Sequence, residues 1–74
     1  MKIQFRYREY IIKLLSFPFH SRWIAKFQAW KPVAQHEEVR TIVSTQTSST
    51  LTDANTTAES LAQKWVNDQH RSSS

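Results

Sequence analysis

The chain has 74 residues with no cysteine and no glycine, and ten Lys and Arg against six Asp and Glu give it a formal charge of +4. This length allows one domain, whose core would bury about 60% of the surface of the unfolded chain. The composition excludes disulfides, cysteine-ligated zinc, thiol nucleophiles and glycine-rich phosphate loops. Three Trp, four Phe and two Tyr must therefore supply the buried surface, alone or together with a partner.

The positive charge lies in the N-terminal half. Residues 1–34 contain seven Lys or Arg and one Glu, a net +6, whereas residues 35–74 contain three Lys or Arg and five Asp or Glu, a net −2. Such asymmetry predicts a polyanionic partner, either nucleic acid or an anionic membrane surface. The alternative is that the basic residues only solvate an edge of the fold.

No segment has the run of about 20 apolar residues that crosses a bilayer, because Lys13, His20 and Arg22 interrupt the N-terminal half. The run from Tyr10 to Leu15 contains a lysine and precedes no small-residue cleavage site, which argues against a secretory signal. We therefore expect a cytoplasmic protein, in keeping with a chain that has no cysteine. A transit peptide is the alternative for the basic residues 1–31, although its loss would remove about half of a small core.

Residues Ile3 to Leu15 fit two structures. As a strand, the segment alternates Phe5 and Tyr7 with two arginines, and it is rich in β-branched and aromatic side chains. As a helix, it aligns five apolar residues on one stripe, namely Tyr7, Tyr10, Ile11, Leu14 and Leu15. The strand is favoured, because two further strands along the chain need a third to form a sheet that is stable alone.

Those two strands are expected at residues 22–30 and 38–45. Both alternate between two kinds of side chain with the period of two that is typical of a strand. Turns are expected at residues 16–21, around Pro18, and at residues 31–37, around Pro32, because a proline biases the residue before it away from helical geometry.

An amphipathic helix should follow a mobile polar loop at residues 46–50. Thr56 and Glu59 form a capping box that predicts the start of the helix, and Thr52 followed by Asp53 is the alternative cap. Apolar residues then recur with helical spacing at Ala54, Ala58, Leu61, Ala62 and Trp65.

The predicted fold is therefore α+β, a three-stranded antiparallel sheet packed on one C-terminal amphipathic helix that ends near Gln69. Residues 1–70 would form a single domain, and residues 71–74 would belong to a frayed polar tail. The predicted core consists of Trp23, Ala25, Phe27, Leu61, Ala62 and Trp65.

The sequence contains no motif of a catalytic or metal site. The three histidines, His20, His36 and His70, lie in predicted turns or in the tail, and none has a second ligand at metal-binding spacing. The two glutamates after His36 are better explained as part of a solvated loop, and Glu59 as part of the helix cap. We therefore expect no enzyme, no metal, no cofactor and no small-molecule substrate.

The second face of the sheet is the candidate functional surface. If Trp23 and Phe27 face the helix, the alternate residues of their strand face the other way and combine basic, amide and aromatic side chains. Arg and Gln can contact base edges there and Lys can contact phosphates, or Trp30, Phe5 and Tyr7 can stack on unpaired bases. The predicted nucleic-acid-binding residues, including three arginines of adjacent strands if the strand registers agree, are Arg6, Arg8, Arg22, Lys26, Gln28, Trp30 and Arg40.

Two segments carry a resemblance to known proteins. They are Arg22-Trp23-Ile24-Ala25-Lys26-Phe27 and Thr57-Ala58-Glu59-Ser60-Leu61-Ala62-Gln63-Lys64-Trp65. Their layout resembles that of small DNA-binding modules in which a three-stranded sheet packs on a helix: the bacterial cell-division activator, the amino-terminal arm domains of some tyrosine integrases, and plant ethylene-response domains. The resemblance covers about two-thirds of the chain and implies that this layout binds DNA.

The favoured function is thus a small non-enzymatic regulatory module that binds nucleic acid through the open face of its sheet. The alternative is a protein–protein adaptor or accessory subunit, including a homodimer, that docks through the sheet face or edge. Ile24 and Trp30 would then belong to a second, covered cluster. A third possibility is binding to a membrane surface by residues 3–15 as a basic amphipathic helix.

Overall fold

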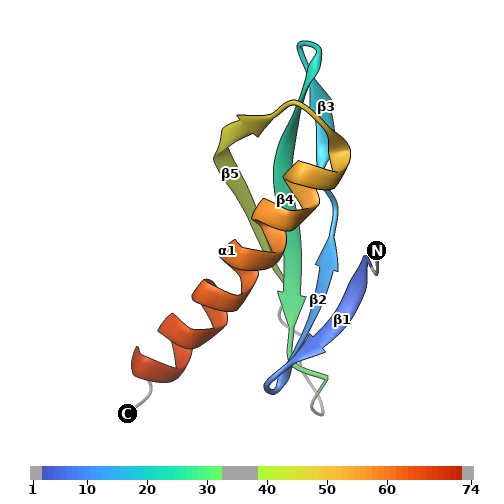
Figure 1. Ribbon diagram of the computed structural model, residues 1–74. Coiled ribbons are helices and arrows are strands. Elements are labelled where there is room, and N and C mark those ends of the chain that lie inside the picture. The colour runs from blue at the N-terminus through green and yellow to red at the C-terminus, as the bar shows by residue number, and fades with distance from the viewer. Residues whose placement is uncertain (1–2, 33–38, 73–74) are drawn as a thin grey trace.

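The computed structural model describes residues 3–32 and 39–72. They form an antiparallel sheet and one helix that crosses a single face of it (Figure 1). The elements are β1 (Gln4–Tyr7), β2 (Tyr10–Leu14), β3 (Phe17–Phe19), β4 (Arg22–Trp30), β5 (Arg40–Ser48) and α1 (Leu51–Ser72). The α+β class and the C-terminal helix are confirmed, whereas the described residues contain five strands rather than three.

Strand β4 is the centre of the sheet. It pairs with β5 on one side, and on the other side with β2 along its second half and with β3 along its first half. Leu14 pairs with Phe27 and Phe17 pairs with Ile24, so the same register continues from β2 to β3 along β4. The two strands therefore act as a single strand that is interrupted at residues 15–16. Strand β1 pairs with β2 at the outer edge.

The predicted N-terminal strand is a hairpin of two strands, β1 and β2, and the helical alternative is wrong. The predicted turn at residues 16–21 is also shorter than expected. Phe17–Phe19 is a strand, and only His20 and Ser21 reverse the chain. Proline is compatible with such an edge strand because the strand needs no N–H donor on its unpaired side. The predicted turn at residues 31–37 lies largely outside the described residues.

The hairpin turns adopt left-handed backbone geometry without glycine. His20 and Ser21 have φ of 48° and 63°, the combination of two positive φ angles found in a type I′ turn, and Arg8 in the β1–β2 turn has φ of 55°. The left-handed region costs a non-glycine residue about 1–2 kcal/mol. The pairing of the flanking strands must offset that cost.

Strand β5 runs further than predicted and is irregular in its middle. Ile24 pairs with Thr47 but Lys26 pairs with Val43, so three β5 residues, 44–46, lie opposite Ala25 alone. The Gln46 N–H is satisfied within this bulge, where it donates to Ser44 Oγ at 3.0 Å. The predicted loop at residues 46–50 is therefore mostly strand.

Helix α1 begins before both predicted caps. The N–H of Asp53 donates to Thr50 Oγ1 at 3.1 Å, so Thr50 is the N-cap and Asp53 places its carboxylate in the first turn. The capping box at Thr56 is wrong, since Thr56 Oγ1 donates to the Thr52 carbonyl at 3.0 Å inside the helix. The helix continues past Gln69 to Ser72.

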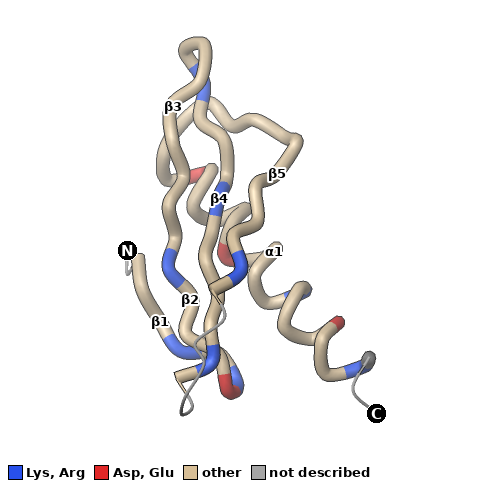
Figure 2. The backbone as a smooth tube through the Cα atoms, turned by 180° about the vertical axis from the view of Figure 1, so that it is seen from behind, with Lys and Arg blue, Asp and Glu red and all other residues tan. Residues whose placement is uncertain are grey.

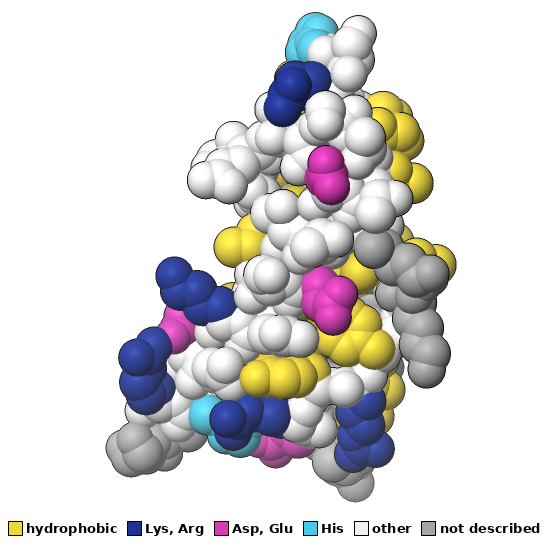
Figure 3. Space-filling view, viewed as in Figure 1, with side chains coloured by type: hydrophobic (Ala, Val, Ile, Leu, Met, Phe, Trp, Pro, Cys, Tyr) yellow, Lys and Arg dark blue, Asp and Glu magenta, His cyan; other side chains and the backbone are white. Residues whose placement is uncertain are grey.

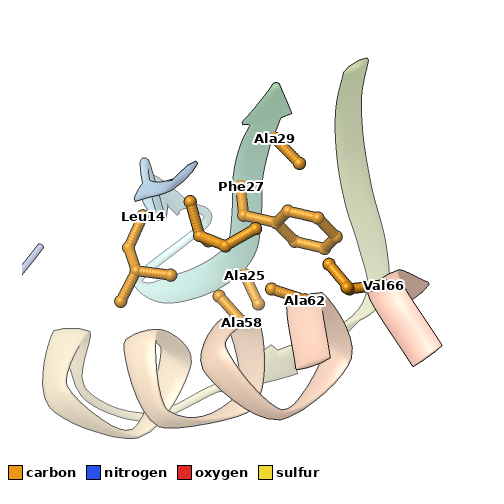
Figure 4. Close-up of a cluster of buried hydrophobic side chains, with 8 residues drawn as sticks. Leu14, Ala25, Phe27, Ala29, Ala58, Ala62 and Val66 are labelled. Carbon is orange, nitrogen blue, oxygen red and sulfur yellow. The ribbon is translucent and has the colours of Figure 1, made fainter. Parts of the chain in front are cut away.

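The core lies between α1 and the strands β2 and β4 (Figure 4). The Phe27 ring points toward α1, where small side chains let the helix approach the sheet closely. The buried cluster is Ile12, Leu14, Ala25, Phe27, Ala29, Ala58, Ala62 and Val66. Trp65 closes it at one side, with ring centroids 5.3 Å from Tyr10 and 6.4 Å from Phe27. Trp23, predicted in the core, is only partly buried and lies outside the cluster.

Candidate nucleic-acid interface

The sheet has one face that α1 does not cover, which we call the open face. Side chains alternate across a strand, so residues between the buried ones of β2 and β4 point away from the helix. The cross-strand partners of these residues show which residues of β1, β3 and β5 lie on the same side of the sheet. The open face consists of Gln4, Arg6, Ile11, Lys13, Phe17, Phe19, Arg22, Ile24, Lys26, Gln28, Trp30, Thr41, Val43 and Thr47.

Charge is segregated between the two sides of the molecule. The five described strands carry five Lys or Arg and no Asp or Glu. Figure 2, seen from the open face, shows Lys and Arg along the strands, whereas Figure 3, seen from the helix side, shows acidic and basic side chains interspersed. The carboxylates of the described residues lie in the β1–β2 turn, at Glu9, and on α1, at Asp53, Glu59 and Asp68. The open face therefore attracts a polyanion more strongly than the helix face does.

Arg22 is held in place by β5. Its Nε donates to Thr47 Oγ1 at 2.6 Å and its Nη2 donates to the Thr47 carbonyl at 3.2 Å. A guanidinium has five N–H donors, so these two bonds orient the group and leave others for a ligand. Arg22 is exposed, and its orientation therefore prepares it for a phosphate or a base edge.

The middle of the open face combines cations with aromatic rings. Lys26 Nζ lies 5.8 Å from the centre of the Phe17 ring, within the range of a cation–π contact. On the same face Lys13 and Gln28 are cross-strand partners. These side chains are partly buried at their stems while their polar ends can reach the surface.

Apolar side chains complete the surface. Ile11 pairs with Trp30 and Phe17 pairs with Ile24, and all four are partly buried. Val43 remains 50% exposed. The open face thus carries two apolar pairs that are separated along β4 by Lys26 and Gln28, and no described element of the chain covers them.

The structure gathers most of the predicted site residues on one surface. Arg6, Arg22, Lys26, Gln28 and Trp30 all lie on the open face. The two other arginines, Arg8 and Arg40, lie elsewhere.

Arg8 occupies the β1–β2 turn, beyond the paired part of the strands. Arg40 pairs with Ala29, whose side chain is buried against α1, so Arg40 belongs to the helix side of the sheet. Phe5 and Tyr7 also belong to that side, because they pack against the core. They are therefore not positioned to stack on bases together with Trp30.

Among the open-face residues that were not predicted as site residues, one is basic, Lys13, and two are aromatic, Phe17 and Phe19. Lys13 could have been found from the alternation in Tyr10–Leu14 if the N-terminal segment had been divided into two strands. The two phenylalanines flank Pro18, whose presence suggested a turn.

A second polar cluster ties the β1–β2 turn to the end of the helix. Glu9 Oε2 lies 3.8 Å from Lys31 Nζ, and Glu9 Oε1 lies 3.1 Å from His70 Nε2, a close contact outside hydrogen-bond geometry. These residues line a pocket of about 160 Å³ together with Tyr10 and Gln69. Within residues 3–32 and 39–72, no group of three His, Cys, Asp or Glu is arranged to hold a metal ion. The cluster is explained by its structural role of joining the turn to α1.

Comparisons of the chain with protein-family models, with curated proteins and with solved structures find no match. In the part of the chain that the structure describes, α1 is long enough to cross a bilayer but too polar to do so.

Proposed function

We propose that this chain is a non-enzymatic regulatory module of the cytoplasm that binds nucleic acid through the open face of its sheet. One observation carries the proposal: the described strands hold five basic residues and no acidic one, and four of the five, Arg6, Lys13, Arg22 and Lys26, share the open face. Phosphate contacts supply the sequence-independent part of nucleic-acid affinity, and a basic surface whose described strands carry no carboxylate suits them.

The proposed roles follow from position and chemistry. Lys13 and Lys26 contact phosphates as point charges, and Arg22, oriented by Thr47, offers paired donors to a phosphate or a guanine edge. Gln28 lies between Lys13 and Thr41 at the centre of the face, where its amide can both donate and accept a hydrogen bond.

Fluorescence anisotropy with labelled 20-nucleotide duplex and single-stranded oligonucleotides tests the proposal. The double variant Arg22→Ala/Lys26→Ala should bind far more weakly, and the slope of log affinity against log salt should fall in magnitude by about two. The matched control is Lys64→Ala/Arg71→Ala, which removes the same charge from α1, on the other side of the sheet.

Absence of binding at low salt would overturn the proposal. Equal losses in the two double variants would show that net charge alone, and not the open face, attracts the nucleic acid.

The apolar part of the open face favours a second candidate, an adaptor or homodimer. Val43 is half-exposed opposite Lys26, and Ile24 and Trp30 are partly buried on the same face; covering such side chains drives protein association. Sedimentation equilibrium together with the anisotropy titration distinguishes the two candidates. A stable dimer that does not bind nucleic acid supports the adaptor, whereas a monomer that binds nucleic acid supports the module.

A further inference from the structure

The β3–β4 hairpin projects from one end of the molecule. Strand β5 ends at Ser48, opposite Trp23, so the four residues 19–22 extend beyond the last paired residue of β5. Figures 1 and 2 show this hairpin reaching past the start of α1 with no other element beside its end. We call Phe19, His20, Ser21 and Arg22 the tip.

The tip presents an aromatic side chain next to a cation. Phe19 and Arg22 are the last cross-strand pair before the turn and lie on the open face. Phe19 is 41% exposed, and its ring lies against that of His20 with centroids 4.2 Å apart and planes tilted by 42°. A large, partly exposed apolar side chain therefore lies beside a cation near the projecting end of the open face.

The tip is also kept narrow. Strand β3 has three residues, and its central residue, Pro18, lacks the N–H that a further strand would require. The reversal occupies two residues, although both take positive φ without being glycine. A two-stranded ribbon with a tight end is narrow enough to lie in a groove of duplex DNA.

We infer that Phe19 is a wedge that inserts between stacked base pairs of duplex DNA and bends the duplex, an inference that rests on the proposed nucleic-acid binding. Proteins that bend DNA commonly place an apolar side chain in a base step, and the bent duplex then wraps more of the protein surface. Here the cations behind the wedge supply that extra contact. At a rise of about 3.3 Å per strand residue, Lys26 lies about 13 Å behind Arg22, which corresponds to roughly four base pairs.

The charge of the ribbon favours duplex DNA over an apolar protein surface as the binding partner of the tip. Residues 17–26 include Arg22 and Lys26 and no Asp or Glu, so the formal charges of the ribbon are all positive. An apolar partner would have to desolvate these charges without neutralising them, whereas a duplex neutralises them with phosphates.

Energy transfer between dyes at the two ends of a 24-base-pair duplex tests the inference. The duplex carries one central TA step, which unstacks easily, with 2-aminopurine replacing the adenine to report local unstacking. The wild-type chain at saturation should raise both the energy transfer and the 2-aminopurine fluorescence. Phe19→Ala should bind about tenfold more weakly and, at its own saturation, leave both signals at the free-duplex level.

Two controls separate the wedge from folding and from binding. Phe19→Leu keeps an apolar wedge and should retain both signals with affinity within about threefold of wild type. Because Phe19 is exposed, Phe19→Ala should keep the circular dichroism spectrum and melting temperature of the parent.

The outcomes are distinct. Wild-type binding without either signal, or unchanged signals with Phe19→Ala, would overturn the wedge and leave the proposed function standing. No binding by the wild-type chain to any duplex at low salt would overturn both.

Discussion

Arg22 and Thr47 join β4 to β5 on the open face by two hydrogen bonds from one guanidinium, 2.6 Å from Nε to Oγ1 and 3.2 Å from Nη2 to the carbonyl oxygen. The Thr47 hydroxyl and carbonyl oxygens thus both accept from the arginine and set its direction. Thr47 is a positioning residue for Arg22.

Replacing Thr47 by valine should loosen Arg22 while leaving the fold intact. The variant loses the Oγ1 acceptor, so nucleic-acid affinity should fall about two- to fivefold, equivalent to about 0.5–1 kcal/mol. NMR of the arginine Nε–H should show faster exchange with water for Arg22 alone. Thr45→Val, on the same exposed strand, is the control and should change neither quantity.

Removing the Trp65 side chain should unfold much of the domain. Its ring contacts Tyr10 and Phe27 at the side of the core, and truncation of a large aromatic there costs about 3 kcal/mol, a large fraction of the stability of a small domain. Chemical denaturation followed by tryptophan fluorescence and circular dichroism measures the loss. Leu51→Ala, at an exposed position, should stay within about 0.5 kcal/mol; equal effects of both changes would contradict the core described above.

The two candidate helix caps predict opposite results for two threonines. Thr50→Ala removes the acceptor of the Asp53 N–H and should lower the free energy of unfolding by about 1 kcal/mol. Thr56→Ala removes a hydroxyl that bonds a carbonyl within the helix and should be neutral or slightly stabilising, because alanine has the higher helix propensity. A larger loss at Thr56 would restore the cap predicted from sequence.

Glycine at position 21 should stabilise the protein. Ser21 has φ of 63°, and relief of left-handed strain should outweigh the extra freedom of the unfolded chain, for a gain of about 0.5–1 kcal/mol and a melting temperature several degrees higher. The same substitution at Ser60, exposed in the middle of α1, should lower stability by about 0.5 kcal/mol. A destabilising Ser21→Gly would show that the turn is unstrained.

Ser16 is a second position at which we expect a substitution to raise the stability of the protein. Its Oγ is buried and has no hydrogen-bond partner among the described residues. Ser16→Ala should therefore raise the free energy of unfolding by about 1 kcal/mol, measured by urea denaturation. Ser44→Ala, which removes the acceptor of the Gln46 N–H, should lower it instead.

Sequence periodicity predicted β4 with its bounds because nine residues alternate without interruption between the core and the open face. It did not predict β3. Pro18 indicates a turn when only local preferences are considered, yet an edge strand tolerates it since only one side pairs. The cap was similarly ambiguous, because a threonine followed three residues later by an acidic residue occurs at both Thr50 and Thr56.

The prediction of the candidate site from sequence was limited because the registers between strands were not known. Alternation within β4 placed Arg22 and Lys26 together, and this needs no information from other strands. Arg40 depended on how β5 pairs, and the observed register puts it opposite Ala29 on the helix side. One residue of shift would have moved it to the open face, and no local pattern decides that shift.

At the level of Ala25, the strands on both sides of β4 lose their regularity, with residues 15–16 outside any strand on one side and the β5 bulge on the other. Every core residue contributed by the sheet lies at this level or on the side away from the tip. The molecule is thus divided into a half that contains the buried cluster of the sheet and an outer half that contributes no residue to that cluster. Substitutions in the outer half can change what the surface binds while the folded state persists, which makes the hairpin the part of the chain freest to diverge.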